Sequence, residues 1–174
     1  MAFQPNPNLA WASASRSLYE AYTDFLLSRQ AIMCTERTIS WYAFTLDKVM
    51  AWMVANGVTS PPEISARHVR AYLSELAQRG VTDSYVNNHA RAIRTMLRFF
   101  LAEDHIQKPV MFRMPTIADK RLLCLTAEQV QKVLKACNTA RDKALISLMV
   151  DTGLRRAEVC ALNWHFFVIA KHFA

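Results

Sequence analysis

Glycine, paired cysteines and long apolar runs are scarce in this sequence, and the lack of cysteine pairs and of long apolar runs each excludes a class of protein. The 174 residues include only three glycines and four cysteines. No two cysteines form a Cys-x-x-Cys pair, and none has a histidine at zinc-finger spacing, so we expect no metal site. No apolar run approaches the roughly 18 residues that a membrane span needs. The N-terminus lacks the basic and apolar regions of a signal peptide, which predicts a cytoplasmic protein with no membrane partner.

The composition is that of a folded protein with a basic surface. Hydrophobic residues make up 52% of the chain, which is ample for a packed core. The formal net charge is +7, from 21 basic and 14 acidic residues, and it favours an anionic partner. Most of the excess lies late in the chain. Residues 1–103 hold ten basic and eight acidic residues, whereas residues 104–174 hold eleven and six.

The few glycines and prolines separate segments whose apolar residues recur with a helical period. Gly57, Gly80 and Gly153 each follow such a segment, and all six prolines fall outside them, as is typical of helix ends. We find no alternating strand pattern. The sequence therefore predicts a four-helix domain over 15–103, after an N-terminal tail over 1–14. Its helices are expected at about 15–31, 35–55, from Ser65 to Gly80, and 84–102.

Residues 104–125 interrupt this helical pattern. They contain two prolines and more basic than acidic residues, and irregular connections of this length are uncommon inside one domain. We interpret them as a basic interdomain linker. Helices resume at Thr126, where a capping box ends at Gln129, and a further helix over about 140–152 stops at Gly153. Residues 126–174 are thus expected to form the beginning of a second domain.

Two of the predicted helices carry basic stripes. In the fourth helix Asn87, Arg91, Arg94 and Arg98 are spaced 4, 3 and 4 residues apart and share one face. Arginine can reach phosphates or guanine, and asparagine can reach adenine, so this face could lie along a DNA groove. For this helix alone, a solvated basic face is the slightly better interpretation.

The second helix adds aromatic side chains to basic ones. Arg37, Trp41, Phe44 and Lys48 share one side, opposite the apolar face. The two aromatic residues could pack on another helix, or lie against a nucleic-acid backbone. Two such helices in one small domain favour DNA binding. The expected DNA contacts are Arg37, Trp41, Lys48, Asn87, Arg91, Arg94 and Arg98, with Lys120 and Arg121 of the linker.

The segment 151–164 resembles the first catalytic box of the tyrosine recombinases, the family of phage integrases and Xer-type enzymes. The matching residues are Thr152, Gly153, Leu154, Arg155, Glu158, Val159, Leu162 and Trp164, while Ala157 stands where the family has Ser or Gly. Upstream, 125–128 and 141–144 resemble the Leu-Thr-x-Glu and Arg-Asp-x-Ala segments of the same catalytic domain. The four-helix segment resembles the family's SAM-like core-binding domain.

The resemblance implies a fold and a chemistry. The chain as present would be all-α, with a SAM-like core-binding domain followed by the first helices of a mixed α+β catalytic domain. In this family a tyrosine attacks a DNA phosphate to give a 3′-phosphotyrosine, without metal, cofactor or small-molecule substrate. Arg155 would be the first phosphate-binding catalytic arginine, supported by Glu158. Double-stranded DNA and other recombinase protomers are the implied partners.

Other parts of the family's catalytic set do not occur in this sequence. It has no His-x-x-Arg motif, and its last tyrosine is Tyr85, within the first domain. We therefore expect a truncated recombinase that binds duplex DNA but cannot cut it alone. The alternative is a non-catalytic DNA-binding regulator or an interaction partner of a full-length recombinase. A helical domain with no DNA role is the third interpretation.

Overall fold

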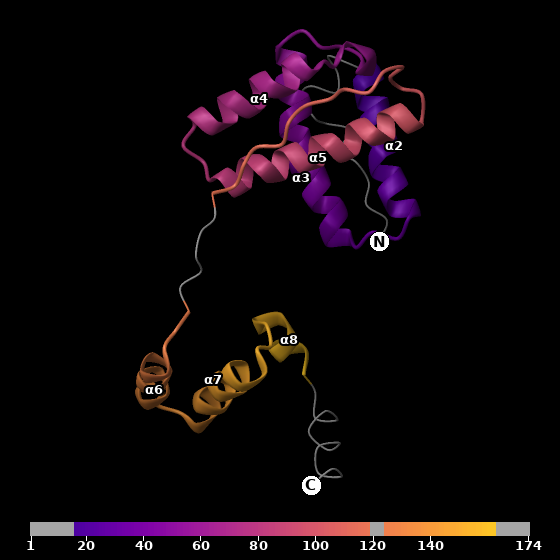
Figure 1. The fold of residues 1–174 in the computed structure, drawn as a ribbon. Coiled ribbons are helices and arrows are strands. Elements are labelled where there is room, and N and C mark those ends of the chain that lie inside the picture. The colour runs from indigo at the N-terminus through magenta and orange to yellow at the C-terminus, as the bar shows by residue number, and fades with distance from the viewer. Residues whose placement is uncertain (1–15, 119–123, 163–174) are drawn as a thin grey trace. The chain divides into compact units, whose positions relative to one another are not determined.

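The computed structural model describes residues 16–118 and 124–162 (Figure 1). Within these two ranges every regular element is a helix and there is no strand, which confirms the predicted all-α character. The chain divides into a first unit, Met1–Asp119, and a second unit, Lys120–Ala174. The elements in chain order are α2 Arg16–Ala31, α3 Glu36–Ala55, the 3-10 helix η1 Pro61–Glu63, α4 Ala66–Gln78, α5 Asp83–Ala102, α6 Ala127–Ala136, α7 Ala140–Thr152 and α8 Arg156–Ala161.

Side-chain caps fix where the helices of the first unit begin. Thr35, Ser65 and Thr82 have extended backbones and precede α3, α4 and α5, and each side-chain oxygen accepts a bond from a backbone N–H of the first turn. Beyond the C-terminal ends of α3 and α4, Gly57 and Gly80 have positive φ angles of 82° and 74°. The predicted boundaries of the helices in the first unit agree with the observed boundaries to within one or two residues.

The core of the first unit lies between α2, α3, α4 and α5. Phe25 of α2 is fully buried and meets two rings edge-on, with centroids 5.2 Å from Tyr42 and 5.6 Å from Phe99. Burying one such large apolar side chain contributes about 1.5–3 kcal/mol. Most residues of the four predicted apolar faces are buried in this core, among them Leu18, Leu26, Leu46, Val49, Met50, Val69, Leu73, Val86, Ile93 and Phe100.

A segment after α5 also belongs to the first unit. Ile106 is buried, and Val110, Phe112 and Met114 pack against the core. The segment is extended and follows α5 closely (Figure 1). Its apolar residues at 110, 112 and 114 alternate with exposed ones, as an extended chain requires when one side packs on a helix. We call residues 109–116 the strap.

The strap places the division between units later than the sequence predicted. The expected linker covered 104–125, but its first half packs on the helices, and the first unit ends at Asp119. The helical period used for the prediction does not detect an extended segment that packs by alternation. The predicted tail over 1–14 lies outside the described residues.

The second unit contains α6, α7 and α8, with α7 in contact with both others. Thr126 and Gln129 form the predicted capping box at the start of α6. Gly153 ends α7 with a φ angle of 68°, as predicted. No residue in 124–162 is buried, and the apolar side chains of Leu145 and Met149 are exposed. Across both described ranges, the helices are too short or too polar to span a bilayer.

Candidate nucleic-acid interface

The basic and aromatic stripe of α3 is exposed, as its residue spacing predicted. Phe44 is 63% exposed and Trp41 is 36% exposed, and Arg37 lies on the surface with them. Lys48 holds this stripe to the neighbouring helix, because its Nζ lies 3.9 Å from the Phe44 ring centroid and donates to the Tyr85 hydroxyl at 3.1 Å. The stripe thus presents two cations and two aromatic rings on one exposed helix face.

The stripe of α5 separates into two pairs. Arg91 and Arg98 are exposed. Asn87 and Arg94 are half-buried because they hold the strap. The amide of Asn87 donates to the Pro115 carbonyl at 2.8 Å, and the guanidinium of Arg94 donates to the Phe112 carbonyl at 3.3 Å. The helical spacing alone could not distinguish the two pairs.

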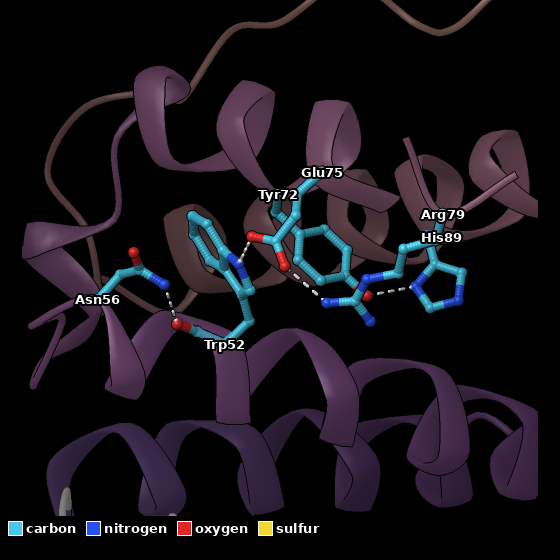
Figure 2. A network of polar contacts seen from close by, with 6 residues as sticks. All are labelled: Trp52, Asn56, Tyr72, Glu75, Arg79 and His89. Carbon is cyan, nitrogen blue, oxygen red and sulfur yellow. Dashed lines mark hydrogen bonds and ion pairs between the residues drawn. The ribbon is translucent and has the colours of Figure 1, made fainter. Parts of the chain in front are cut away.

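A buried polar pair lies beneath the contact between Lys48 and Tyr85. The Tyr72 hydroxyl and His89 Nδ1 are hydrogen-bonded at 2.8 Å (Figure 2). The centroid of the His89 ring lies 4.6 Å from that of the Tyr85 ring. His89 is only 2% exposed. Burial, with a smaller effect of the Lys48 charge, lowers the pKa of His89 from 6.5 to about 4. His89 is therefore neutral at physiological pH.

A surface network lies beside this pair, because the Trp52 ring meets the Tyr72 ring edge-on with centroids 5.6 Å apart. The Trp52 indole donates to a Glu75 oxygen at 2.6 Å, and Arg79 donates to the other Glu75 oxygen at the same distance (Figure 2). The indole bond, followed by that from Arg79, lowers the pKa of Glu75. Asn56 in turn donates to the Trp52 carbonyl at 2.8 Å. The bond from Trp52 to Glu75 connects the C-terminal half of α3 to α4.

Sequence reasoning missed both the pair and the network. His89 lies among apolar residues on the buried face of α5, between Val86 and Ile93. That position is the signal that could have identified it as a buried histidine in need of a partner.

The second unit contains the predicted arginine and glutamate pair. Arg155 precedes α8, and its backbone N–H donates to Glu158 Oε2 at 2.7 Å. Its guanidinium Nη1 donates to Glu158 Oε1 at 3.2 Å. The Arg155 side chain is 86% exposed, so most of its N–H groups face solvent. The expected contact from Glu158 to Arg155 is therefore present.

Three residues singled out in the sequence lie outside the described residues: Lys120 and Arg121 of the predicted linker, and Trp164 of the catalytic box. The remaining predicted residues divide between the two units. Arg37, Trp41, Lys48 and the α5 residues lie in the first unit, and Arg155 and Glu158 lie in the second.

The helical first unit and the Thr-Gly-Leu-Arg turn of the second define a class of two-part integrase-like proteins, and comparison with known families agrees. Residues 18–106 match the N-terminal SAM-like domain of phage integrases. Residues 124–170 match the phage integrase family. The first match alone covers just over half of the chain. The chain belongs to the phage integrase family of tyrosine recombinases.

Individual relatives are Xer-type tyrosine recombinases. The chain is 26% identical to tyrosine recombinase XerC of Bacillus pumilus over 133 residues, which cover 72% of this chain and 44% of the relative. It is 23% identical to XerC of Xanthomonas campestris over 159 residues, covering 88% and 49%. It is 25% identical to XerD of Bifidobacterium longum over 147 residues, covering 79% and 48%. The chain thus spans about half the length of these relatives.

Proposed function

We propose that this chain binds duplex DNA through one face of its first unit. We define the α3–α5 surface as the exposed residues Arg37, Trp41, Phe44, Lys48, Arg91 and Arg98. The observation that carries the proposal is the arrangement of Lys48, which holds the exposed Phe44 ring and the Tyr85 hydroxyl together. Ordered cations cost less conformational entropy when they bind than free surface lysines do.

Each residue type on this surface has a matching group on DNA. The guanidiniums of Arg37 and Arg91 suit phosphate oxygens or guanine edges. The exposed rings of Trp41 and Phe44 suit sugars and thymine methyl groups. Asn87 and Arg94 are left out of the α3–α5 surface, since both donate to carbonyls of the strap.

The second unit contributes Arg155 to the same proposal. An exposed guanidinium with one side fixed by Glu158 can offer its other N–H groups to a DNA phosphate. Phosphoryl transfer would still require a nucleophile and further cations. The sequence has no tyrosine after Tyr85 and no His-x-x-Arg motif. We therefore propose that these 174 residues alone bind DNA without cleaving it.

DNA binding can be tested with fluorescence anisotropy on a labelled duplex, using the whole chain and a salt titration. Replacing Arg37 and Arg91 with alanine should weaken binding at least tenfold and lower the salt slope by about 2, because two phosphate contacts are lost. The matched control removes two exposed arginines of α4, Arg67 and Arg70, and should have a smaller effect. Equal losses in the two variants would contradict the α3–α5 surface.

Strand cleavage is tested separately with a nicked suicide duplex. We expect no covalent protein–DNA adduct on a denaturing gel. An adduct formed by these 174 residues would disprove the non-cleaving part of the proposal and leave the binding part intact.

A second candidate function is association with other recombinase protomers. It is favoured by the exposed apolar side chains of the second unit, which include Leu125, Val133, Leu145, Met149 and Val150. Light scattering of the whole chain would test for self-association. Replacing Leu145 and Met149 with aspartate should then return a larger species to the monomer.

A further inference from the structure

Two hydrogen bonds join the strap to α5, and the spacing of their donors on α5 matches the spacing of their acceptors on the strap. Asn87 and Arg94 lie seven residues apart on α5, and the carbonyls that they hold, on Pro115 and Phe112, lie three residues apart on the strap. Seven helical residues rise about 10.5 Å, and three extended residues span about 10 Å. The order is reversed, so the strap runs antiparallel to α5. Both hydrogen bonds can therefore form without distorting either segment.

Packing on the strap supports the same register. The guanidinium carbon of Arg94 lies 5.5 Å from the centroid of the Phe112 ring, whose backbone carbonyl it also holds. Val110 and Met114, two residues to either side of Phe112, pack against the core. Arg94 thus contacts Phe112 of the strap twice, through the aromatic ring and through the backbone carbonyl.

Neighbouring residues of α5 provide the contrast. Arg91 and Arg98 flank Arg94 by one turn on each side and are exposed, whereas Asn87 and Arg94 are half-buried. Residues that alternate along one predicted stripe therefore differ in what they contact.

We infer that Asn87 and Arg94 are positioning residues, which fasten the strap to α5 and shorten the tether between the two units. With the strap fastened, the chain from Pro115 to Thr126 can extend at most about 40 Å. If the strap were released, the free chain would begin at Lys108 and the same limit would be about 65 Å. This consequence for DNA binding rests on the proposed function, in which both units bind one duplex.

A shorter tether raises the effective concentration of the second unit near DNA held by the first. For a flexible tether this concentration falls with about the −3/2 power of length, so lengthening the tether from about 40 to about 65 Å lowers it about twofold. Fastening the strap would therefore favour binding of the second unit to DNA that the first unit already holds.

Limited tryptic cleavage of the whole chain without DNA tests the fastening directly, because the strap contains the exposed Arg113. In the Asn87→Ala/Arg94→Ala variant, cleavage after Arg113 should be about tenfold faster, while the helical circular dichroism signal stays unchanged. Phe112→Ala should have the same effect from the strap side. Arg91→Ala/Arg98→Ala is the matched control on the same helix and should leave the rate of cleavage after Arg113 unchanged.

The outcomes separate the inference from the proposed function. Unchanged cleavage after Arg113 in both Asn87→Ala/Arg94→Ala and Phe112→Ala would overturn the fastening, whether or not the chain binds DNA. If the double variant loses helical signal as well, the single variant Asn87→Ala is measured in its place, with the same criterion.

The tether consequence is tested with Phe112→Ala, which removes no charge. Its affinity for duplex DNA should fall about twofold with an unchanged salt slope. Faster cleavage after Arg113 with unchanged affinity would overturn the tether consequence, and failure of the unmodified chain to bind DNA would overturn the proposed function instead.

Discussion

Lys48 of α3 and Tyr85 of α5 are hydrogen-bonded across the two helices, with 3.1 Å between the ammonium nitrogen and the phenol oxygen. The same ammonium lies 3.9 Å from the centroid of the Phe44 ring. One cation thus fixes the spacing between an exposed ring on one helix and a hydroxyl on the other. The contributions of the Lys48 charge and of the Lys48 position to DNA binding can therefore be tested with separate substitutions.

Replacing Tyr85 with phenylalanine should weaken DNA binding while leaving the net charge unchanged. The variant loses the hydroxyl that positions Lys48, so we expect a two- to fivefold loss of affinity with no change in salt slope. Because the bond is exposed, the free energy of unfolding should change by less than about 1 kcal/mol. Anisotropy and urea denaturation measure the two quantities.

Lys48→Met provides the comparison, because it removes the charge as well. Its salt slope should fall by about 1. An affinity loss in Tyr85→Phe equal to that in Lys48→Met, with the same fall in slope, would contradict a purely positional role for the hydroxyl.

Acid should destabilise the first unit through His89. The pKa of His89 is about 4 in the folded chain because of burial, against 6.5 for an ordinary histidine. The unfolded chain therefore binds the extra proton first, and the free energy of unfolding should fall as the pH drops from about 6.5 toward 4. The total loss expected from this group is on the order of 1–3 kcal/mol.

Urea denaturation at several pH values between 7 and 4 measures this loss. His89→Gln cannot gain the proton and should show a flatter dependence over the same range. An equally steep dependence in that variant would assign the acid sensitivity to other groups.

Phe25→Ala should destabilise the first unit by about 3–5 kcal/mol, because it leaves a cavity between the Tyr42 and Phe99 rings. Leu27→Ala on the same helix is the control. Leu27 is 61% exposed, and its replacement should cost less than about 0.5 kcal/mol. Urea denaturation at pH 7 compares the two, and similar losses would indicate that the Phe25 site collapses around the smaller side chain.

Arg155→Ala should weaken DNA binding more than Arg156→Ala, although the two neighbours carry the same charge and both are exposed. Only Arg155 has the contact with Glu158 that orients a guanidinium. Glu158→Gln should give a smaller loss, since it keeps the side chain but weakens the ion pair. Anisotropy on one duplex ranks the three variants, and equal effects at Arg155 and Arg156 would remove the reason for assigning a phosphate to Arg155.

The helices were predictable because local rules set them. Ser65 and Thr126 are caps whose side chains accept the bonds that capping rules require, and Gly153 adopts the left-handed conformation that ends a helix. The buried faces followed from helical periodicity. The contact between Arg155 and Glu158 was also predictable, because it joins residues three positions apart on one helix turn.

Contacts between distant segments were not predictable in this way. The bonds from Asn87 and Arg94 reach 28 and 18 residues along the chain, and helical spacing contains no information about such partners. The bond between His89 and Tyr72 joins two helices, and the two residues lie 17 positions apart in the sequence. Each depends on how segments pack, so a single sequence shows the residue type but not its partner.

The matched register of the strap also determines where the chain tolerates changes in length. One residue inserted between Phe112 and Pro115 would add about 3.3 Å to one side of a pairing that α5 holds at two fixed points. Either Asn87 or Arg94 would then lose its carbonyl. Insertions after Ala118 leave both points intact. Variation in the distance between the two halves of this protein should therefore be confined to the residues beyond the strap.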